Sequence, residues 1–204
     1  MALVQRIQQR ILNICLKPRQ EWDVIAGETS STADLLKNYA LPLVGIGAIA
    51  VFIGLSFVGI SAGPFAQYRV PVGTGLAAAV VEFGRQIATA FILSVIVNEL
   101  APKFGGEKNS AQALKVAVYS LTPAWAVAVL WILPSLGALV SIVSLYGIYL
   151  LYLGLPRLMK SPPEKSVNYT VVVVACGIGV AIVTGLISRA IVGAGLGAVP
   201  PSLR

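Results

Sequence analysis

Residues 167–198 read VNYTVVVVACGIGVAIVTGLISRAIVGAGLGA, and this stretch decides the fold. Arg189 is its only charged side chain. A helix needs about 20 predominantly apolar residues to cross the hydrocarbon core of a bilayer. The segment is long enough to span a membrane, and its extra length indicates tilt or an exit along the interface.

Four further apolar segments precede it, at about 39–60, 72–97, 111–133 and 136–155. The whole chain has 204 residues, of which 57% are hydrophobic and 11% are charged. An ordinary soluble domain carries about 25% charged residues. This composition excludes a soluble globular enzyme. The sequence predicts an all-α polytopic membrane protein with five transmembrane helices in a domain at 39–198, followed by a short outer tail at 199–204.

Residues 1–38 form the segment before the first span. Leu3, Ile7, Ile11 and Ile14 recur there at near-helical spacing, with polar residues between them, which predicts an N-terminal amphipathic helix. Two interpretations stay open. The helix lies at the membrane interface with its arginines near anionic headgroups, or it packs on the rest of the protein.

The basic residues predict the orientation. Eleven of the 15 fall before the first span, between the second and third, or between the fourth and fifth: Arg6, Arg10, Lys17, Arg19, Lys37, Lys103, Lys108, Lys115, Arg157, Lys160 and Lys165. The positive-inside rule then places the N-terminus in the cytoplasm and the C-terminus outside, in a cytoplasmic (inner) membrane. These cations are spread over several breaks instead of forming one stripe, so no nucleic-acid partner is expected.

The chain contains no histidine, which removes the commonest general base and the commonest metal ligand. Its two cysteines, Cys15 and Cys176, lie in very different surroundings. We therefore expect no catalytic residues, no metal site and no cofactor.

Charged and polar residues within the second apolar segment are the strongest candidates for chemistry. Glu82 and Arg85 are three residues apart on one helix face, and a charge at membrane depth is costly unless it is paired. Arg189 of the last segment should lie at a comparable depth. The hypothesis is a buried cluster of Glu82, Arg85 and Arg189, extended by Gln86 and Thr89. It either serves as an ion, proton or anionic-ligand site or fixes the register of the helices.

Small residues and one proline suggest helix contacts and shape. Gly177, Ala181 and Gly185 follow at four-residue steps, a pattern that permits close backbone approach, either within the bundle or in a homo-oligomer. Pro123 lacks a backbone N–H, so a kink is expected in the third segment.

A third set of residues is expected at the cytoplasmic surface. Trp22 is typical of an interfacial aromatic residue, and Tyr152 ends a tyrosine stripe beside a basic loop. We expect contact with anionic lipid headgroups or a protein partner from Arg6, Arg10, Trp22, Tyr152, Arg157, Lys160 and Lys165.

The ordered arrangement of several short motifs resembles the Yip family, membrane proteins first described as interactors of the Ypt and Rab GTPases. The resemblance rests on Pro18 with Trp22, on Gly105-Gly106 leading to the stretch from Tyr119 to Pro123, and on the stretch from Tyr149 to Lys160. It implies five spans, a cytoplasmic N-terminus and an outer or lumenal C-terminus. The short region before the first span is similar to prokaryotic members.

Two functions follow as hypotheses. The first is a non-enzymatic membrane protein that organises or recruits partners at the cytoplasmic membrane. The alternative is a small channel or transporter that uses the buried Glu/Arg cluster to pass an ion, a proton or a small anion.

Overall fold

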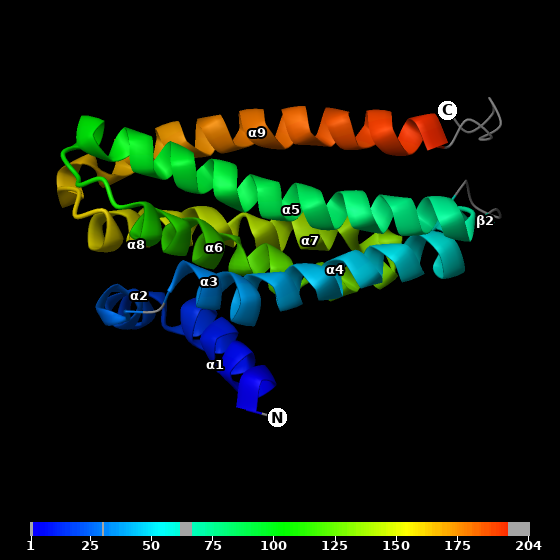
Figure 1. Ribbon diagram of the computed structural model, residues 1–204, viewed down its shortest axis with the longest axis horizontal. Coiled ribbons are helices and arrows are strands. Elements are labelled where there is room, and N and C mark those ends of the chain that lie inside the picture. Colours follow the sequence, from blue (N-terminus) through cyan, green and yellow to red (C-terminus); the bar gives the residue numbers. More distant parts are fainter. Residues whose placement is uncertain (1, 30, 62–66, 196–204) are drawn as a thin grey trace.

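The computed structural model of the protein describes residues 2–29, 31–61 and 67–195. The predicted outer tail at 199–204 lies outside these residues, as does the end of the segment predicted at 167–198. Long helices lie side by side along one axis (Figure 1). In chain order, the elements are α1 (Ala2–Leu16), α2 (Pro18–Gly27), α3 (Thr32–Leu35), η1 (Leu36–Ala40), α4 (Leu41–Ile53), η2 (Gly54–Val58), β1 (Ile60–Ser61), β2 (Gln67–Tyr68), α5 (Val72–Leu100), η3 (Ala101–Phe104), α6 (Ser110–Ala126), η4 (Ala128–Ile132), η5 (Pro134–Leu136), α7 (Gly137–Ser144), α8 (Tyr146–Leu158), η6 (Pro163–Lys165) and α9 (Ser166–Gly195).

Successive long helices run in alternating directions. In Figure 1, α4 runs toward the right-hand end, α5 returns, α6 leads back to the right, α7 and α8 return, and α9 runs to the right again. Close contacts join α5 to α4, α6 and α9. The connections from α5 to α6 and from α8 to α9 therefore lie at one end of the bundle, and the connections from α4 to α5 and from α6 to α7 lie toward the other.

Local sequence explains where several helices begin and end. Ser31 caps α3 by accepting a hydrogen bond from the backbone N–H of Asp34 at 3.1 Å, and Asn109 caps α6 by accepting one from Gln112 at 3.1 Å. Pro18 starts α2 because the first turn of a helix leaves its N–H unbonded in any case. Gly105 ends η3 in the left-handed conformation, with φ +76°, which glycine adopts without strain.

Helix α6 occupies the centre of the bundle. It contacts α5, α8, α4 and α1, and most of its residues from Ala113 to Trp125 are buried. By contrast, α9 presents a row of apolar side chains outward, including Ile178, Ile182 and Leu186. Large exposed apolar side chains of this kind are the signature of a lipid-facing helix.

Within the part of the chain that the structure describes, four helical stretches are long and apolar enough to cross a membrane: Thr32–Val58, Val72–Phe104, Pro134–Leu158 and Pro163–Ile191. The all-helical membrane architecture predicted from the sequence is confirmed at this level. The segment predicted at 111–133 is not among the four. In the structure it consists of the 17-residue α6 followed by the separate 3₁₀ turn η4, and α6 contains the buried polar side chains of Lys115, Ser120 and Thr122.

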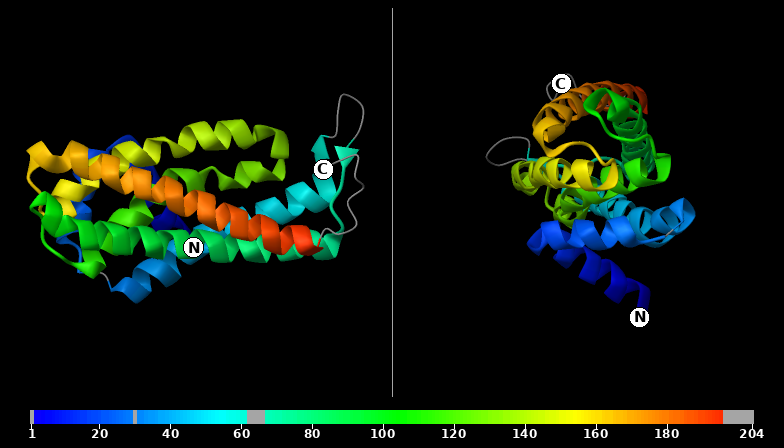
Figure 2. Two further views of the ribbon diagram at one scale, coloured as in Figure 1. Left: turned by 90° about the horizontal axis from the view of Figure 1, so that it is seen from above. Right: turned by 90° about the vertical axis from the view of Figure 1, so that its left-hand side faces the viewer.

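The first two helices lie beside the bundle rather than within it. Figure 2 shows α1 extending away from the other helices at its N-terminal end. Its Ile14 is fully buried, and Ile7 and Ile11 pack against the same hydrophobic core. These contacts agree with the interpretation in which the N-terminal helix packs on the protein. We call α1 and α2 together, residues 2–27, the N-terminal platform.

Candidate functional site

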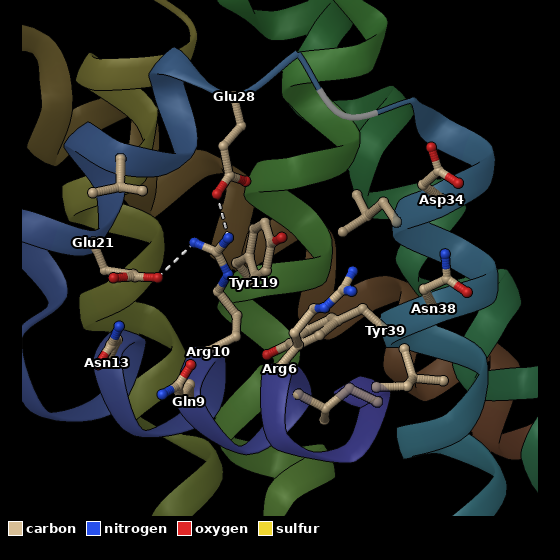
Figure 3. Close-up of a pocket in the computed structure, with 14 residues that line it drawn as sticks. Arg6, Gln9, Arg10, Asn13, Glu21, Glu28, Asp34, Asn38, Tyr39 and Tyr119 are labelled. Carbon is tan, nitrogen blue, oxygen red and sulfur yellow. Dashed lines mark hydrogen bonds and ion pairs between the residues drawn. The ribbon is translucent and has the colours of Figure 1, made fainter. Parts of the chain in front are cut away.

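An arginine on α1 joins the N-terminal platform into one polar network. Arg10 Nη1 donates to Glu21 Oε1 at 2.5 Å, and Arg10 Nη2 donates to Glu28 Oε1 (Figure 3). The guanidinium also lies over the ring of Tyr119 on α6, with its carbon 5.6 Å from the ring centroid. One cation thus connects α1, α2 and α6 through two ion pairs and a cation–π contact.

The charge state of Arg10 follows from the same contacts. Burial alone lowers the pKa of Arg10, but the hydrogen bond to Glu28 and the nearby carboxylates raise that pKa above its usual value. The guanidinium therefore stays charged. Glu21 is only 7% exposed, and the positive charge of Arg10 offsets the cost of burying its carboxylate.

Lys115 of α6 binds the other end of the platform. Its side chain is buried at 4% exposure, and Nζ donates to the carbonyl oxygens of Ile25 at 3.2 Å and Glu28 at 2.6 Å. These carbonyls lie at the C-terminal end of α2, where a cation is favoured by the partial negative charge of the helix terminus. Lys115 therefore ties α2 to α6 and does not contact solvent as an ordinary loop lysine would.

A cavity of about 720 Å³ opens beside this network, between α1, α2, the start of the first apolar helix and α6. Figure 3 shows its polar lining, in which Arg6, Asp34 and Asn38 lie on the side opposite Glu21. Tyr39, whose hydroxyl is 3.0 Å from Thr122 Oγ1, is part of the wall. The cavity is a mixed-charge hollow at the junction of the platform and the bundle.

Sequence reasoning missed most of this network. Glu21, Glu28 and Tyr39 were not among the predicted site residues, Lys115 was expected only as a loop cation, and Tyr119 was named only as part of a family motif. Their partners lie 11 to 90 residues away along the chain, so no local spacing indicates them. The available signal was the presence of Glu21 and Glu28 in a short N-terminal region, where buried carboxylates require a cation such as Arg10.

The polar residues of α5 form a second network. Arg85 holds Glu82 with two hydrogen bonds, from Nε at 2.8 Å and from Nη2 at 2.5 Å. Gln86 donates to Glu82 at 2.8 Å and accepts from the indole N–H of Trp125 on α6 at 3.2 Å. A bidentate guanidinium–carboxylate pair of this kind neutralises both charges.

Arg189 and Thr89, which the sequence also places in this cluster, make no described hydrogen bond to Glu82 or Arg85. Arg189 lines a cavity of about 680 Å³ together with Glu82 and Arg85, so the three charged residues face one space. Among the described contacts, none joins Arg189 to Glu82. The hydroxyl of Thr89 is buried and has no hydrogen-bond partner among the described residues, so it does not extend the network.

Trp22 corrects an expectation. The sequence predicts a tryptophan in the interfacial belt, but Trp22 is 0% exposed and therefore contacts neither lipid nor a partner. Its ring lies edge-on to Tyr119, with 6.1 Å between centroids, and fills the space beside Gly154 of α8. A Cβ at Gly154 would lie 2.7 Å from the indole, so this glycine makes room for the tryptophan.

The other expected surface cations gather at one end of the bundle. Arg157 pairs with Asp23 at 2.7 Å, and Lys160 pairs with Glu107 at 2.7 Å. The loops that carry them touch, because the N–H of Glu107 donates to the carbonyl of Met159 at 2.8 Å. Lys165 approaches Gly105 of the neighbouring loop. Tyr152 is exposed close by, whereas Arg6 is exposed at the mouth of the 720 Å³ cavity.

The predicted packing residues meet different surroundings. A Cβ at Gly177 would lie 3.8 Å from the side chain of Leu93 on α5, an ordinary packing distance, whereas Ala181 is exposed and a Cβ at Gly185 would meet nothing within 4 Å. Among the described residues, none of these three positions therefore lies against a neighbour so closely that a small residue is required. Pro123 lies inside α6, which continues only to Ala126 before the chain turns into η4.

Comparison with known proteins identifies the family. The model of the Yip1 domain matches residues 12–184, which is most of the chain. The chain belongs to the Yip1 domain family. Two relatives, both described as inner membrane protein YohC, come from Escherichia coli strains K12 and CFT073; each is 28% identical over 164 residues, covering 79% of this chain and 84% of the relative. No solved structure matches the chain significantly.

The Yip1 domain match contains most of the residues described above. Glu21, Glu28, Lys115 and the Glu82–Arg85 pair fall within it, while Arg10 and Arg189 fall just outside its limits. The chain is thus a Yip-family integral membrane protein, as its resemblance indicated, with the platform and the α5 network as its two candidate sites.

Proposed function

We propose that this protein is a non-enzymatic, multi-pass inner-membrane protein whose N-terminal platform recruits a cytoplasmic partner. The observation that carries the proposal is the 720 Å³ cavity between the platform and the bundle, with the exposed polar side chains of Arg6, Asp34 and Asn38 at its mouth. The ion pairs of Arg10 and the hydrogen bonds of Lys115 hold this surface in place. The names of the curated relatives support the inner-membrane location.

The proposed orientation uses five crossings, with the N-terminus in the cytoplasm and the C-terminus outside. It is supported by the course of α6 and η4, which lead from one end of the bundle toward the other between α5 and α7 (Figure 1). It is also supported by the gathering of Lys103, Lys108, Arg157, Lys160 and Lys165 in touching loops.

Reporter fusions distinguish five crossings from four. Alkaline phosphatase and a fluorescent protein fused in turn to residue 1 and residue 204 are expected to report opposite compartments, because an odd number of crossings separates the ends. If the reporters place both ends of the chain in the same compartment, the proposed orientation is contradicted and four crossings are favoured.

Site-specific photo-cross-linking tests recruitment. A photoreactive residue in place of Arg6 is expected to capture one cytoplasmic protein in living cells, and the same residue in place of Phe57, exposed near the other end of the bundle, is not. Replacing Asn38 with Trp narrows the cavity mouth and is expected to abolish the adduct at position 6. Equal capture at positions 6 and 57, or capture unaffected by Asn38→Trp, would refute a binding role for the cavity.

A second candidate function is ion or small-anion passage. It is favoured by the 680 Å³ cavity that brings Glu82, Arg85 and Arg189 to one space in the outer half of the proposed bundle. In proteoliposomes this candidate predicts a proton or chloride flux that Glu82→Gln abolishes and Glu99→Gln, at an exposed carboxylate, leaves unchanged. Absence of flux in the wild-type protein would exclude this candidate.

A further inference from the structure

A second hollow lies at the cationic end of the bundle, with a volume of about 690 Å³. Its walls come from α8, from the loop between α8 and α9, from the first residue of α9 and from Asp23 of α2. Among the lining residues, the cations Arg157 and Lys160 outnumber the single carboxylate of Asp23 by one, while Glu107, which pairs with Lys160, lies outside the lining. An excess of positive charge favours an anionic ligand.

The carboxylates that pair with both cations are reached by water, and Arg157 is also held by a hydrogen bond from Nη1 to the carbonyl oxygen of Leu153 at 3.2 Å. Arg157 Nε donates to Asp23 Oδ1 at 2.7 Å, and the Asp23 side chain is 65% exposed. The Lys160–Glu107 pair is exposed on both sides. Exposed pairs of this kind contribute little to stability, so a better anion can replace either carboxylate at small cost.

Ser161 supplies an independent observation. It lines the hollow, is 3% exposed, and its hydroxyl has no hydrogen-bond partner among the described residues. A buried hydroxyl without a partner is unfavourable, and a ligand oxygen would satisfy it. The preceding residue, Lys160, has φ 53°, a left-handed conformation that is uncommon for a lysine and that is often retained at functional sites.

The remaining walls indicate what else the ligand carries. Ser166 of the lining is the first residue of the 30-residue α9, whose N-terminal end favours a negative group. The side chains of Tyr152, Leu153 and Pro156 form an apolar and aromatic wall on α8. A lipid carries a phosphate and an apolar chain side by side, and tyrosines such as Tyr152 often lie at the membrane interface. The combination of cations with an apolar wall therefore favours a lipid over a soluble phosphate.

We propose that this hollow binds the phosphate of an anionic phospholipid from the cytoplasmic leaflet, through Arg157, Lys160 and the hydroxyl of Ser161. The lipid phosphate takes the place of the Asp23 carboxylate on Arg157. The site rests on the proposed orientation, since the cationic end must face the anionic leaflet. It deepens the proposed function, because Asp23 belongs to α2 and lipid occupancy changes how the platform is held.

Titration of the purified full-length protein with phosphatidylglycerol, followed by native mass spectrometry in detergent, tests the site. We expect one saturable phosphatidylglycerol site, with phosphatidylcholine binding about tenfold more weakly, because its quaternary ammonium would meet Arg157 and Lys160. Lys160→Gln and Ser161→Ala should each weaken phosphatidylglycerol binding about fivefold through loss of one phosphate contact, and Asp23→Asn should strengthen it by removing the competing carboxylate.

Lys103→Gln is the matched control, because it removes the same charge from an exposed lysine at the same end but outside the hollow. Equal losses in Lys103→Gln and Lys160→Gln would show a general surface charge and overturn the site. Competition by inorganic phosphate at equal concentration would overturn its assignment to lipid. The measurement uses purified protein in detergent and therefore needs neither a protein partner nor a defined orientation in a cell. A negative result would overturn the lipid site and leave the recruitment proposal unaffected.

Discussion

Replacement of Trp22 by alanine is expected to cost the largest amount of stability of any substitution considered, about 3–5 kcal/mol, as for other fully buried aromatic side chains. Trp22 is enclosed by Tyr119 of α6 and Gly154 of α8, and α2 contacts α8. Loss of the indole opens a cavity where α2 joins the bundle. The surrounding helices cannot close around that cavity without moving α2.

The measurement is the thermal or denaturant-induced unfolding of the detergent-solubilised protein, followed by loss of near-ultraviolet circular dichroism. Trp131→Ala is the control, because Trp131 is 36% exposed and its replacement leaves a smaller cavity. Equal destabilisation by the two substitutions would contradict a special role of Trp22 in holding the platform.

Replacement of Arg10 by glutamine is expected to have the second-largest effect. Removing one partner of a buried ion pair costs about 3–5 kcal/mol, and the partial exposure of Arg10 lowers the expectation to about 2–3 kcal/mol. The cost arises because the buried carboxylate of Glu21 loses its cationic partner. The cation–π contact with Tyr119 is lost as well.

Limited proteolysis measures the consequence directly. The connection between α2 and α3 is expected to become more susceptible in Arg10→Gln, because the platform separates from the bundle more often. The double variant Arg10→Met with Glu21→Leu should recover most of the resistance, since it removes the buried carboxylate together with the cation and leaves only the more exposed Glu28 without its partner. Lys108→Gln breaks an exposed pair with Glu99 and should change nothing measurable. A double variant as susceptible as Arg10→Gln would show that the ion pair itself is indispensable.

The sequence predicts what depends on local composition. Hydropathy identifies apolar helices because lipid contact requires a long run with very few charges, as in 167–198, where Arg189 is the single charged residue. The Glu82–Arg85 pair could be anticipated because its members are three residues apart on one helix. Hydropathy alone does not show that α6, within the segment predicted at 111–133, is enclosed by other helices. Its neighbours are protein rather than lipid, so it tolerates Lys115 and Thr122.

Contacts between distant segments could not be predicted in this way. The interfacial-belt rule was wrong for Trp22, because the rule records how often tryptophan lies at an interface and cannot detect a space left by Gly154, far along the chain. The ion pairs of Arg10 depend on how α1 crosses α2, which no periodicity specifies. Arg189 lines the same cavity as Glu82, but its apolar surroundings in the sequence did not indicate whether the two would bond.

The burial of α6 has a consequence for how the protein is made. A nascent helix leaves the translocon sideways when its own surface prefers lipid, and the surface of α6 is adapted to its neighbours α5 and α8. In the proposed arrangement of five crossings, we expect α6 to be retained at the translocon until α7 and α8 have been synthesised, and then to enter the bilayer with them as a hairpin. Ribosomes arrested soon after Ala126 would therefore hold a chain whose central helix has not yet been released.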